Sequence, residues 1–290
     1  MRKRRIGYLG ALALSIAAVF PASALATGTQ NVEAGFVPQF NQSITIPPPV
    51  ADTGPKDSKA GTLYTRLFLS DYGTTPSSAG VFDIHAPEEL TFNTKGLTEC
   101  DPATITGKGA EEARSLCEDS VIGEGHATAA LAGTPVTVTG DTTLFNGTKQ
   151  NGFSTVLFHS TAGGLPIVLV SEMQDSPLAG AGTLFHTLVA ISAGGAVPDG
   201  TPIVDTDFTN TKKYTDEKLA KKAKKTKKKA KKASGKKAKK LKKKAQKQKK
   251  ASKKSWVVGS CGTDGTMTTT VKVQYTSGPD QTATATQSCT

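Results

Sequence analysis

Short runs of β-branched and aromatic residues recur along the chain from Thr62 onward, separated by glycine, proline, asparagine and aspartate. Such runs, bounded by turn residues, are typical of strands in an all-β protein. The expected strands are Thr62–Ser70, Gly80–His85, Leu90–Asn93, Gly125–Leu131, Pro135–Thr139, Thr142–Phe145, Phe153–Ser160, Pro166–Met173, Thr183–Ser192 and Pro202–Thr209. This pattern predicts an antiparallel sandwich or barrel-like sheet.

The C-terminal residues show the clearest alternation of apolar and polar positions. Met267, Thr269, Val271, Val273 and Tyr275 fall on one face of a strand, with threonine, lysine and glutamine between them. Gly278-Pro279-Asp280 then provides a turn, and alanine alternates with threonine in the residues that follow. A period of two with a central turn predicts a half-buried hairpin.

One short helix is expected at Gly109–Cys117. The segment consists largely of good helix formers, and Glu111 and Glu112 lie near its N-terminus, where the helix dipole favours negative charge. We expect a surface excursion between strands.

Residues 1–26 have the pattern of a signal peptide. Arg2-Lys3-Arg4-Arg5 precedes the apolar run Ile6–Phe20, and Ala24-Leu25-Ala26 supplies the small residues of a cleavage site. The run is shorter than the span of about 20 residues that crosses a bilayer, although an uncleaved anchor remains the alternative. We therefore expect an exported protein, secreted or held in the cell envelope.

The remaining chain divides into four parts. Residues 27–60 form a Pro/Gly-rich extended leader with one possible edge strand at Ser43–Ile46, and residues 61–211 form the main part of the β domain. A Lys-rich insertion follows at 212–254, and residues 255–290 complete the domain. The simplest topology makes Pro202–Thr209 and Trp256–Cys261 neighbouring strands, with the insertion as a long hairpin loop between them.

Charge separates the insertion from the rest of the chain. It contains 24 lysines against only Asp216 and Glu217, a net charge of +22, whereas the whole chain carries +12. All other residues therefore sum to −10, and to −14 without the four basic residues of the signal peptide. The mature protein should be an acidic body with one strongly basic insertion.

Within the insertion, a Lys-Lys-Ala unit of about three residues repeats. Alanine and lysine favour helix, but lysines three and four positions apart repel one another, so we expect disorder or an unstable helix that breaks at Ser234-Gly235. The candidate polyanion-binding residues are Lys221, Lys222, Lys224, Lys225, Lys227, Lys228, Lys229, Lys236, Lys237, Lys239, Lys240, Lys242, Lys243 and Lys244. Because the lysine repeat itself contains no aromatic side chain for base stacking, binding would proceed by charge and counterion release.

Three interpretations of the insertion remain open. It binds anionic envelope polymers, anionic lipid surfaces or extracellular nucleic acid; it is a tolerated expansion of an ordinary hairpin; or it folds back on the acidic body. The sequence does not identify a specific protein partner, and no cofactor is expected.

The four cysteines favour disulfides over a metal site, because the chain has no C-x-x-C motif and no Cys/His cluster. Cys100 and Cys117 lie near each other in the sequence, as do Cys261 and Cys289. We expect these two local bridges, although the sequence leaves the other two connectivities open.

Several segments resemble a known group of proteins. They are Asn93–Cys100, Ala113–Cys117, Val121–Ala127 and Phe145-Asn146-Gly147, together with the terminal cysteine pair. They resemble uncharacterised exported β-rich proteins that occur in many copies in certain soil actinobacteria, over about Thr62–Thr290. The polylysine stretch and the acidic strand near Asp83 depart from that pattern. The resemblance implies export, β structure and two local disulfides, and it assigns no activity and no catalytic residue.

Candidate chemistry is sparse. His85, His126, His159 and His186 lie on different expected strands without metal-ligand spacing, and no G-x-S-x-G nucleophile motif occurs. Asp205 and Asp207 share one strand face, which indicates a solvated surface. The preferred hypothesis is a non-catalytic structural, adhesive or binding protein. The alternatives are a secreted hydrolase that uses His159, His186 and nearby carboxylates, or a β-sandwich that holds a small apolar ligand or a sugar.

Overall fold

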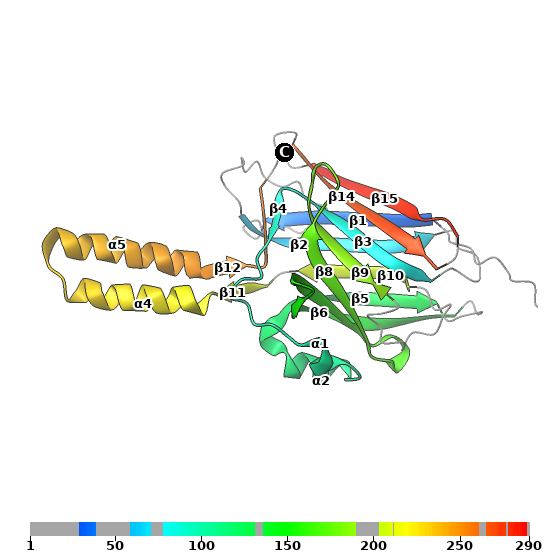
Figure 1. Ribbon diagram of the computed structural model, residues 1–290, viewed down its shortest axis with the longest axis horizontal. Helices are drawn as coiled ribbons and strands as arrows, with labels where there is room; N and C mark the ends of the chain where they lie inside the picture. The colour runs from blue at the N-terminus through cyan, green and yellow to red at the C-terminus, as the bar shows by residue number, and fades with distance from the viewer. Residues whose placement is uncertain are drawn as a thin grey trace, which may run out of the picture.

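The computed structural model describes residues 29–38, 59–70, 78–130, 136–189, 203–210, 212–260, 265–276 and 278–288. The expected signal peptide, the possible edge strand at Ser43–Ile46 and the cysteines Cys261 and Cys289 lie outside these residues. Within them the molecule consists of one large antiparallel sheet and a long helical hairpin that projects from its end (Figure 1).

The sheet confirms the all-β prediction. Its strands are β1 (Thr29–Pro38), β2 (Lys59–Ser70), β3 (Ala79–Pro87), β4 (Leu90–Phe92), β5 (Val121–Ala130), β6 (Thr137–Gln150), β7 (Phe153–Ser160), β8 (Ile167–Asp175), β9 (Ala181–Leu188), β10 (Ile203–Asn210), β13 (Val257–Gly259), β14 (Thr266–Tyr275) and β15 (Gln281–Ser288). They are ordered β15-β14-β3-β9-β8-β7-β6-β5-β10-β2-β13-β4, and β1 pairs with β2.

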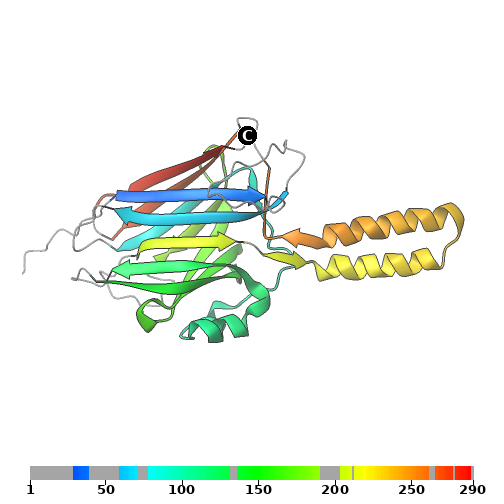
Figure 2. The same cartoon turned by 180° about the vertical axis from the view of Figure 1, so that it is seen from behind.

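This sheet curls into a half-barrel. β1 lies along β2 from Thr29 opposite Ser70 to Pro38 opposite Gly61, and it also contacts β15 at the far end of the strand order. The two ends of the sheet therefore approach each other, as the views from both sides show (Figure 2). β1 falls in the segment that the sequence predicts to be an extended leader, so part of that leader belongs to the sheet.

The C-terminal hairpin has the predicted register. Val271 lies opposite Ala283 and Thr269 opposite Ala285, and Met267, Val271 and Val273 are all buried. Its alternating faces were therefore a reliable signal. Elsewhere a boundary differs: the two strands expected at Pro135–Thr139 and Thr142–Phe145 are one continuous strand, β6, because Gly140 continues the pairing with β5 instead of forming a turn.

Apolar side chains from most strands fill the inside of the curled sheet. The central cluster includes Leu63, Ile122, Val156, Phe185 and Phe208, and Trp256 packs on it with only 2% of its surface exposed. Gly125 lets β10 approach β5 closely, because a Cβ atom there would lie 1.7 Å from the carbonyl oxygen of Asp207. The packing of the core therefore depends on large apolar side chains and on a glycine that lets two strands lie close together.

A small helical excursion covers the outer face of β6, β7 and β8. It comprises α1 (Pro102–Ile105), α2 (Ala110–Leu116) and a 3₁₀ turn at Glu118–Ser120, and a second 3₁₀ turn lies at Ala162–Gly164. Ile105 and Ala113 are fully buried against Phe145, Leu157 and Val168. α2 confirms the expected helix, whereas α1 was not predicted.

The Cys100–Cys117 disulfide is present, with its Cα atoms 5.6 Å apart. Cys100 also exchanges backbone hydrogen bonds with β6, through Asn146 and Thr148. The bridge thus ties the end of α2 to the sheet, as the local pairing predicts.

Candidate functional site

The Lys-rich insertion is a helical hairpin on a two-stranded base. Strands β11 (Lys213–Thr215) and β12 (Lys253–Ser255) pair antiparallel, and between them lie α4 (Glu217–Lys231) and α5 (Gly235–Ser252). We call residues Glu217–Ser252 the lysine hairpin. Of the two expected states, disorder and helix, the structure has helix. The break falls at Lys232–Ser234, which shares Ser234 with the predicted break at Ser234-Gly235, but Gly235 already belongs to α5.

The predicted neighbours of the insertion are wrong. β10 and β13 do not pair with each other; each pairs with a different stretch of β2, at Leu63–Phe68 and at Lys59–Ala60. The reason is that the short strands β11 and β12 already close the insertion, so the flanking strands are free to bond to the long strand β2. The insertion is a hairpin as predicted, but the strands that pair at its base are β11 and β12 and not the two strands that the sequence suggested.

The base is anchored to the body by directional bonds. The Tyr214 hydroxyl donates to the carbonyl oxygens of Asn93 and Lys95, each at 3.1 Å, and burial raises the Tyr214 pKa to about 12. The Asn93 amide donates to the carbonyl oxygen of Ser255 at 3.1 Å. Trp256, the residue after β12, inserts into the core beside Phe92, with ring centroids 4.9 Å apart.

Asp216 begins the first helix. Its Oδ1 accepts the Leu219 backbone N–H at 3.0 Å, its own N–H donates to the carbonyl oxygen of Ser252 at 2.8 Å, and Lys254 Nζ lies 3.6 Å from Oδ2. The hydrogen bond from Leu219 is the main cause that lowers the Asp216 pKa, and the Lys254 charge adds to it. One carboxylate therefore caps α4 and ties it to the end of α5.

The two helices meet along a seam that contains no lysine. From α4 and the residues just after it, the seam contains Leu219, Ala223, Thr226, Ala230 and Ala233; from α5 it contains Ala238, Leu241, Ala245, Gln248 and Ser252, and all ten are less exposed than the lysines. Their spacing alternates between three and four residues, which is the heptad spacing of packed helices. Sequence reasoning that counted a repeat of about three residues missed this signal, although the heptad can be found in the sequence alone.

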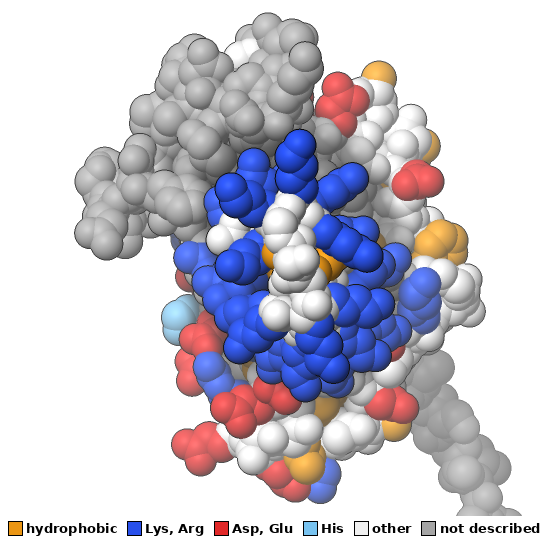
Figure 3. Space-filling view, turned by 90° about the vertical axis from the view of Figure 1, so that its left-hand side faces the viewer, with side chains coloured by type: hydrophobic (Ala, Val, Ile, Leu, Met, Phe, Trp, Pro, Cys, Tyr) orange, Lys and Arg blue, Asp and Glu red, His pale blue; other side chains and the backbone are white. Residues whose placement is uncertain are grey.

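All twenty lysines of the lysine hairpin are exposed. Viewed toward the tip of the hairpin, they form a continuous blue surface around the backbone (Figure 3). Glu217 is the single carboxylate among them, and it pairs with Lys221 at 2.9 Å. The hairpin points away from the body (Figure 1), so its lysines do not fold back on the acidic surface of their own chain.

One flank of the seam is hollowed into a groove of about 730 Å³. Alanines 220, 223, 230 and 245 line its apolar part. Its lysines are Lys224, Lys227 and Lys231 from α4 and Lys242, Lys249 and Lys253 from the α5 side. Three of these, Lys231, Lys249 and Lys253, are absent from the set of candidates that the sequence suggested.

His159 and His186, which the hydrolase alternative brings together, lie apart in the sheet. His159 is fully buried and its Nε2 donates to the carbonyl oxygen of Lys108 at 2.8 Å, while His186 Nδ1 lies 2.6 Å from Asp83 Oδ1. The register through β8 places them two strands and four residues apart, roughly 16 Å from the strand spacings of regular sheets. The hydrolase alternative required them to converge, and they do not.

The other two histidines have local partners. His85 Nδ1 lies 2.9 Å from Ser176 Oγ, and burial lowers the His85 pKa, assisted by the Lys272 charge. His126 Nδ1 lies 3.2 Å from Asp207 Oδ1, whereas Asp205 accepts two hydrogen bonds from Arg66. In the part of the chain that the structure describes, no cluster of three His, Cys, Asp or Glu side chains could hold a metal ion.

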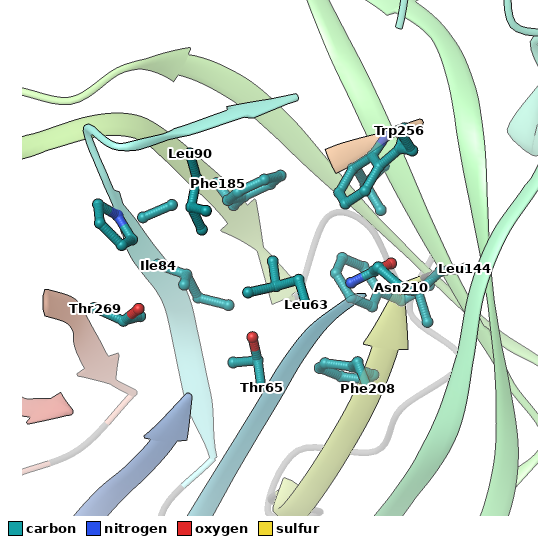
Figure 4. Close-up of a pocket in the computed structure, with 14 residues that line it drawn as sticks. Leu63, Thr65, Ile84, Leu90, Leu144, Phe185, Phe208, Asn210, Trp256 and Thr269 are labelled. Atoms are coloured by element: carbon teal, nitrogen blue, oxygen red, sulfur yellow. The ribbon is translucent and has the colours of Figure 1, made fainter. Parts of the chain in front are cut away.

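The interior cavity of the body is small. It has a volume of about 40 Å³ among Leu63, Phe185, Phe208, Asn210 and Trp256 (Figure 4). Pockets that hold small molecules typically measure about 300–1,000 Å³, so this core is too well filled for a ligand. The buried Asn210 Oδ1 and Trp256 Nε1 atoms have no hydrogen-bond partner, and the volume is sufficient for about one water molecule between them.

Among the described residues, no helix has the length and apolarity needed to cross a membrane. No protein-family model matches the chain, and no curated protein matches it either.

Proposed function

We propose that the protein is a non-catalytic exported binding or adhesive protein whose lysine hairpin attaches it to anionic polymers. One observation carries this proposal: every lysine of the hairpin is exposed, on a helical pair held away from a body of opposite net charge. A tolerated expansion has no need of a seam without lysine, an N-terminal cap or a base bonded to the body. These features favour a functional hairpin over a tolerated sequence expansion.

Helix formation has an electrostatic consequence for binding. About 20 lysines lie along helices of 15 and 18 residues, which are roughly 22 and 27 Å long at 1.5 Å per residue. Holding these charges together is unfavourable in isolation, because lysines at i+3 and i+4 repel. A polyanion would relieve that repulsion and release its own counterions, so affinity should be high in low salt and should fall steeply as salt is added.

The body contributes orientation. Because residues outside the insertion carry a net negative charge, an anionic polymer or surface attracts the hairpin and repels the body. The protein should bind with its hairpin inward and its sheet held outward. Among the described residues, the separation of His159 from His186 does not support the hydrolase alternative, and the filled core does not support the apolar-ligand alternative.

The test is retention of the mature protein on a heparin column as the salt concentration is raised. A first variant replaces Asp216–Ser252 with the two-residue turn Asn-Gly, which joins Thr215 of β11 directly to its partner Lys253 of β12. A second variant keeps the seam and changes every lysine of the hairpin to glutamine. We expect the wild type to elute at high salt and both variants to pass through.

The glutamine variant is the decisive control, because it keeps the shape and removes the charge. Its far-UV circular dichroism should retain the helical signal, since glutamine and lysine have similar helix propensity. Equal retention of wild type and both variants would refute the proposal. If the wild type and the glutamine variant were both retained and the Asn-Gly variant was not, binding would depend on the shape of the hairpin, and the electrostatic mechanism would be refuted.

A further inference from the structure

The two flanks of the lysine hairpin differ. Eight of the ten seam residues are followed directly by a residue that lines the groove: Ala220, Lys224, Lys227, Lys231, Lys242, Gln246, Lys249 and Lys253. The residues directly before the same eight seam residues lie on the opposite flank: Lys218, Lys222, Lys225, Lys229, Lys240, Lys244, Lys247 and Ala251. The groove flank thus has a smaller or shorter side chain at two of its eight positions, Ala220 and Gln246, whereas the opposite flank has one at Ala251.

The groove combines an apolar floor with two cationic rims. Ala223, Ala230 and Ala245 are nearly completely buried and form the floor, and the methylene stems of the lysines form the walls. On the α4 rim the lysines are three and four residues apart, about 4.5 and 6 Å along the helix axis. On the α5 rim they are seven and four residues apart, about 10.5 and 6 Å, with Gln246 between the first two. Charged amino groups thus face the same narrow space from both helices.

We propose that this groove is the binding site for a single unbranched polyanion chain, such as a linear polyphosphate. This inference rests on the proposed function and specifies its ligand. Packed helix axes lie about 8–10 Å apart, so the space between the rims accommodates one slender chain that is neutralised from both sides. A nucleic acid duplex, whose grooves alone are about 6 and 12 Å wide, is too thick to enter, and a flat bilayer surface reaches only the outer lysine tips.

Two variants with the same net charge test the site. The groove variant changes Lys224, Lys227, Lys231, Lys242, Lys249 and Lys253 to glutamine. The flank variant changes Lys222, Lys225, Lys229, Lys240, Lys244 and Lys247 to glutamine. Each removes three lysines beside α4 and three beside α5, and both should retain the helical signal of the wild type.

The probe is long-chain inorganic polyphosphate, titrated against each full-length mature protein at several salt concentrations. For a single-chain polyanion the salt slope changes by about 0.7 for each phosphate contact, so the groove variant should lose a slope of about 4 and on the order of 100-fold or more in affinity at 0.1 M salt. The flank variant should lose less than about tenfold. Duplex DNA of equal charge should bind both variants equally.

A third variant keeps the charge and fills the space. Ala220→Leu with Gln246→Leu narrows the groove without removing a lysine, and we expect it to weaken polyphosphate binding while leaving duplex binding unchanged.

Equal losses of polyphosphate affinity in the groove and flank variants would overturn the groove site and leave the proposed function intact. A greater effect of the groove variant on duplex DNA, or on phosphatidylserine vesicles, than on polyphosphate would also overturn it and identify the other ligand. A wild-type protein that binds none of these probes at low salt would refute the proposed function itself.

Discussion

Asp216 is the single residue through which the helix cap, the end of α5 and the base of the hairpin are connected. Changing it to alanine removes the acceptor of the Leu219 N–H and leaves Lys254 without its carboxylate. Loss of an N-cap typically costs about 1 kcal/mol, so we expect Asp216→Ala to reduce the helical ellipticity at 222 nm and lower the melting temperature of the hairpin.

Asparagine at the same position provides the control, because it caps almost as well as aspartate. The folded pKa of Asp216 is lowered from its ordinary value of 3.8, so its charged form stabilises the hairpin above pH 3.8. That contribution is lost as the pH falls through the lower folded pKa. Asp216→Asn should remove this acid dependence and keep the helix; an unchanged acid transition would assign it to other carboxylates.

His159 is a base and Asp216 is an acid, but the lowered pKa of each makes the protein less stable as the pH falls. Burial lowers the His159 pKa from 6.5, because protonation would place a charge on Nδ1, which is buried without a hydrogen-bond partner. The hydrogen bond from Nε2–H to the Lys108 carbonyl oxygen opposes this shift without cancelling it. The unfolded chain therefore binds more protons below pH 6.5, and the free energy of unfolding should decrease there by up to about 1.4 kcal/mol per pH unit.

We expect His159→Gln to flatten this part of the stability curve, as measured by urea unfolding between pH 5 and 7. The remaining slope belongs to His85, whose pKa is also lowered. A His159→Gln curve parallel to that of the wild type would contradict the assignment.

At the scale of the element, the lysine hairpin exists because its seam excludes charge. Ala223 is 6% exposed and Ala245 is 7% exposed, whereas Ala251 on the same helix as Ala245 is exposed. Replacing Ala223 and Ala245 with lysine would place two unpaired charges between the helices, and burial of an unpaired charge costs several kcal/mol. We expect this double variant to lose most of its helical circular dichroism and keep its sheet signal.

Ala251→Lys is the matched control, because it adds the same side chain outside the seam. It should leave the helical signal unchanged. If the double variant stayed as helical as the control, the seam would have no role in holding the helices together.

Elements differ in how far the sequence predicts them. The hairpin β14–β15 was predictable because its alternation is local and its inner face is apolar. β1 was not, because its pairing with β2 depends on residues about 30 positions away. The seam was overlooked because alanine at heptad spacing is obscured when lysine occupies nearly every other position. The groove could not be predicted at all, since it arises only when two helices face each other.

At the scale of the whole molecule, body and hairpin should unfold separately. The hairpin joins the body through two short strands, and its helices pack mainly on each other. Salt screens repulsion between lysines, so added salt should raise the melting temperature of the hairpin and leave that of the body nearly unchanged. Circular dichroism at 222 nm reports the hairpin, and fluorescence of Trp256, the single tryptophan, reports the body.

Coincident transitions by both probes at every salt concentration would show one cooperative unit and contradict this separation. A variant with the Asn-Gly turn in place of the lysine hairpin gives the reference curve of the body. Its tryptophan transition should match that of the full protein.

Because the insertion begins and ends in the paired strands β11 and β12, the body requires only that the two chain ends beyond this pair lie at the spacing of neighbouring strands. Seven residues added to each helix would preserve the heptad register and extend the reach by about 10 Å. Length can therefore change in whole heptads by duplication without disturbing the scaffold. For the same reason, the lysine hairpin could be inserted between the two paired strands of a β-hairpin in an unrelated protein.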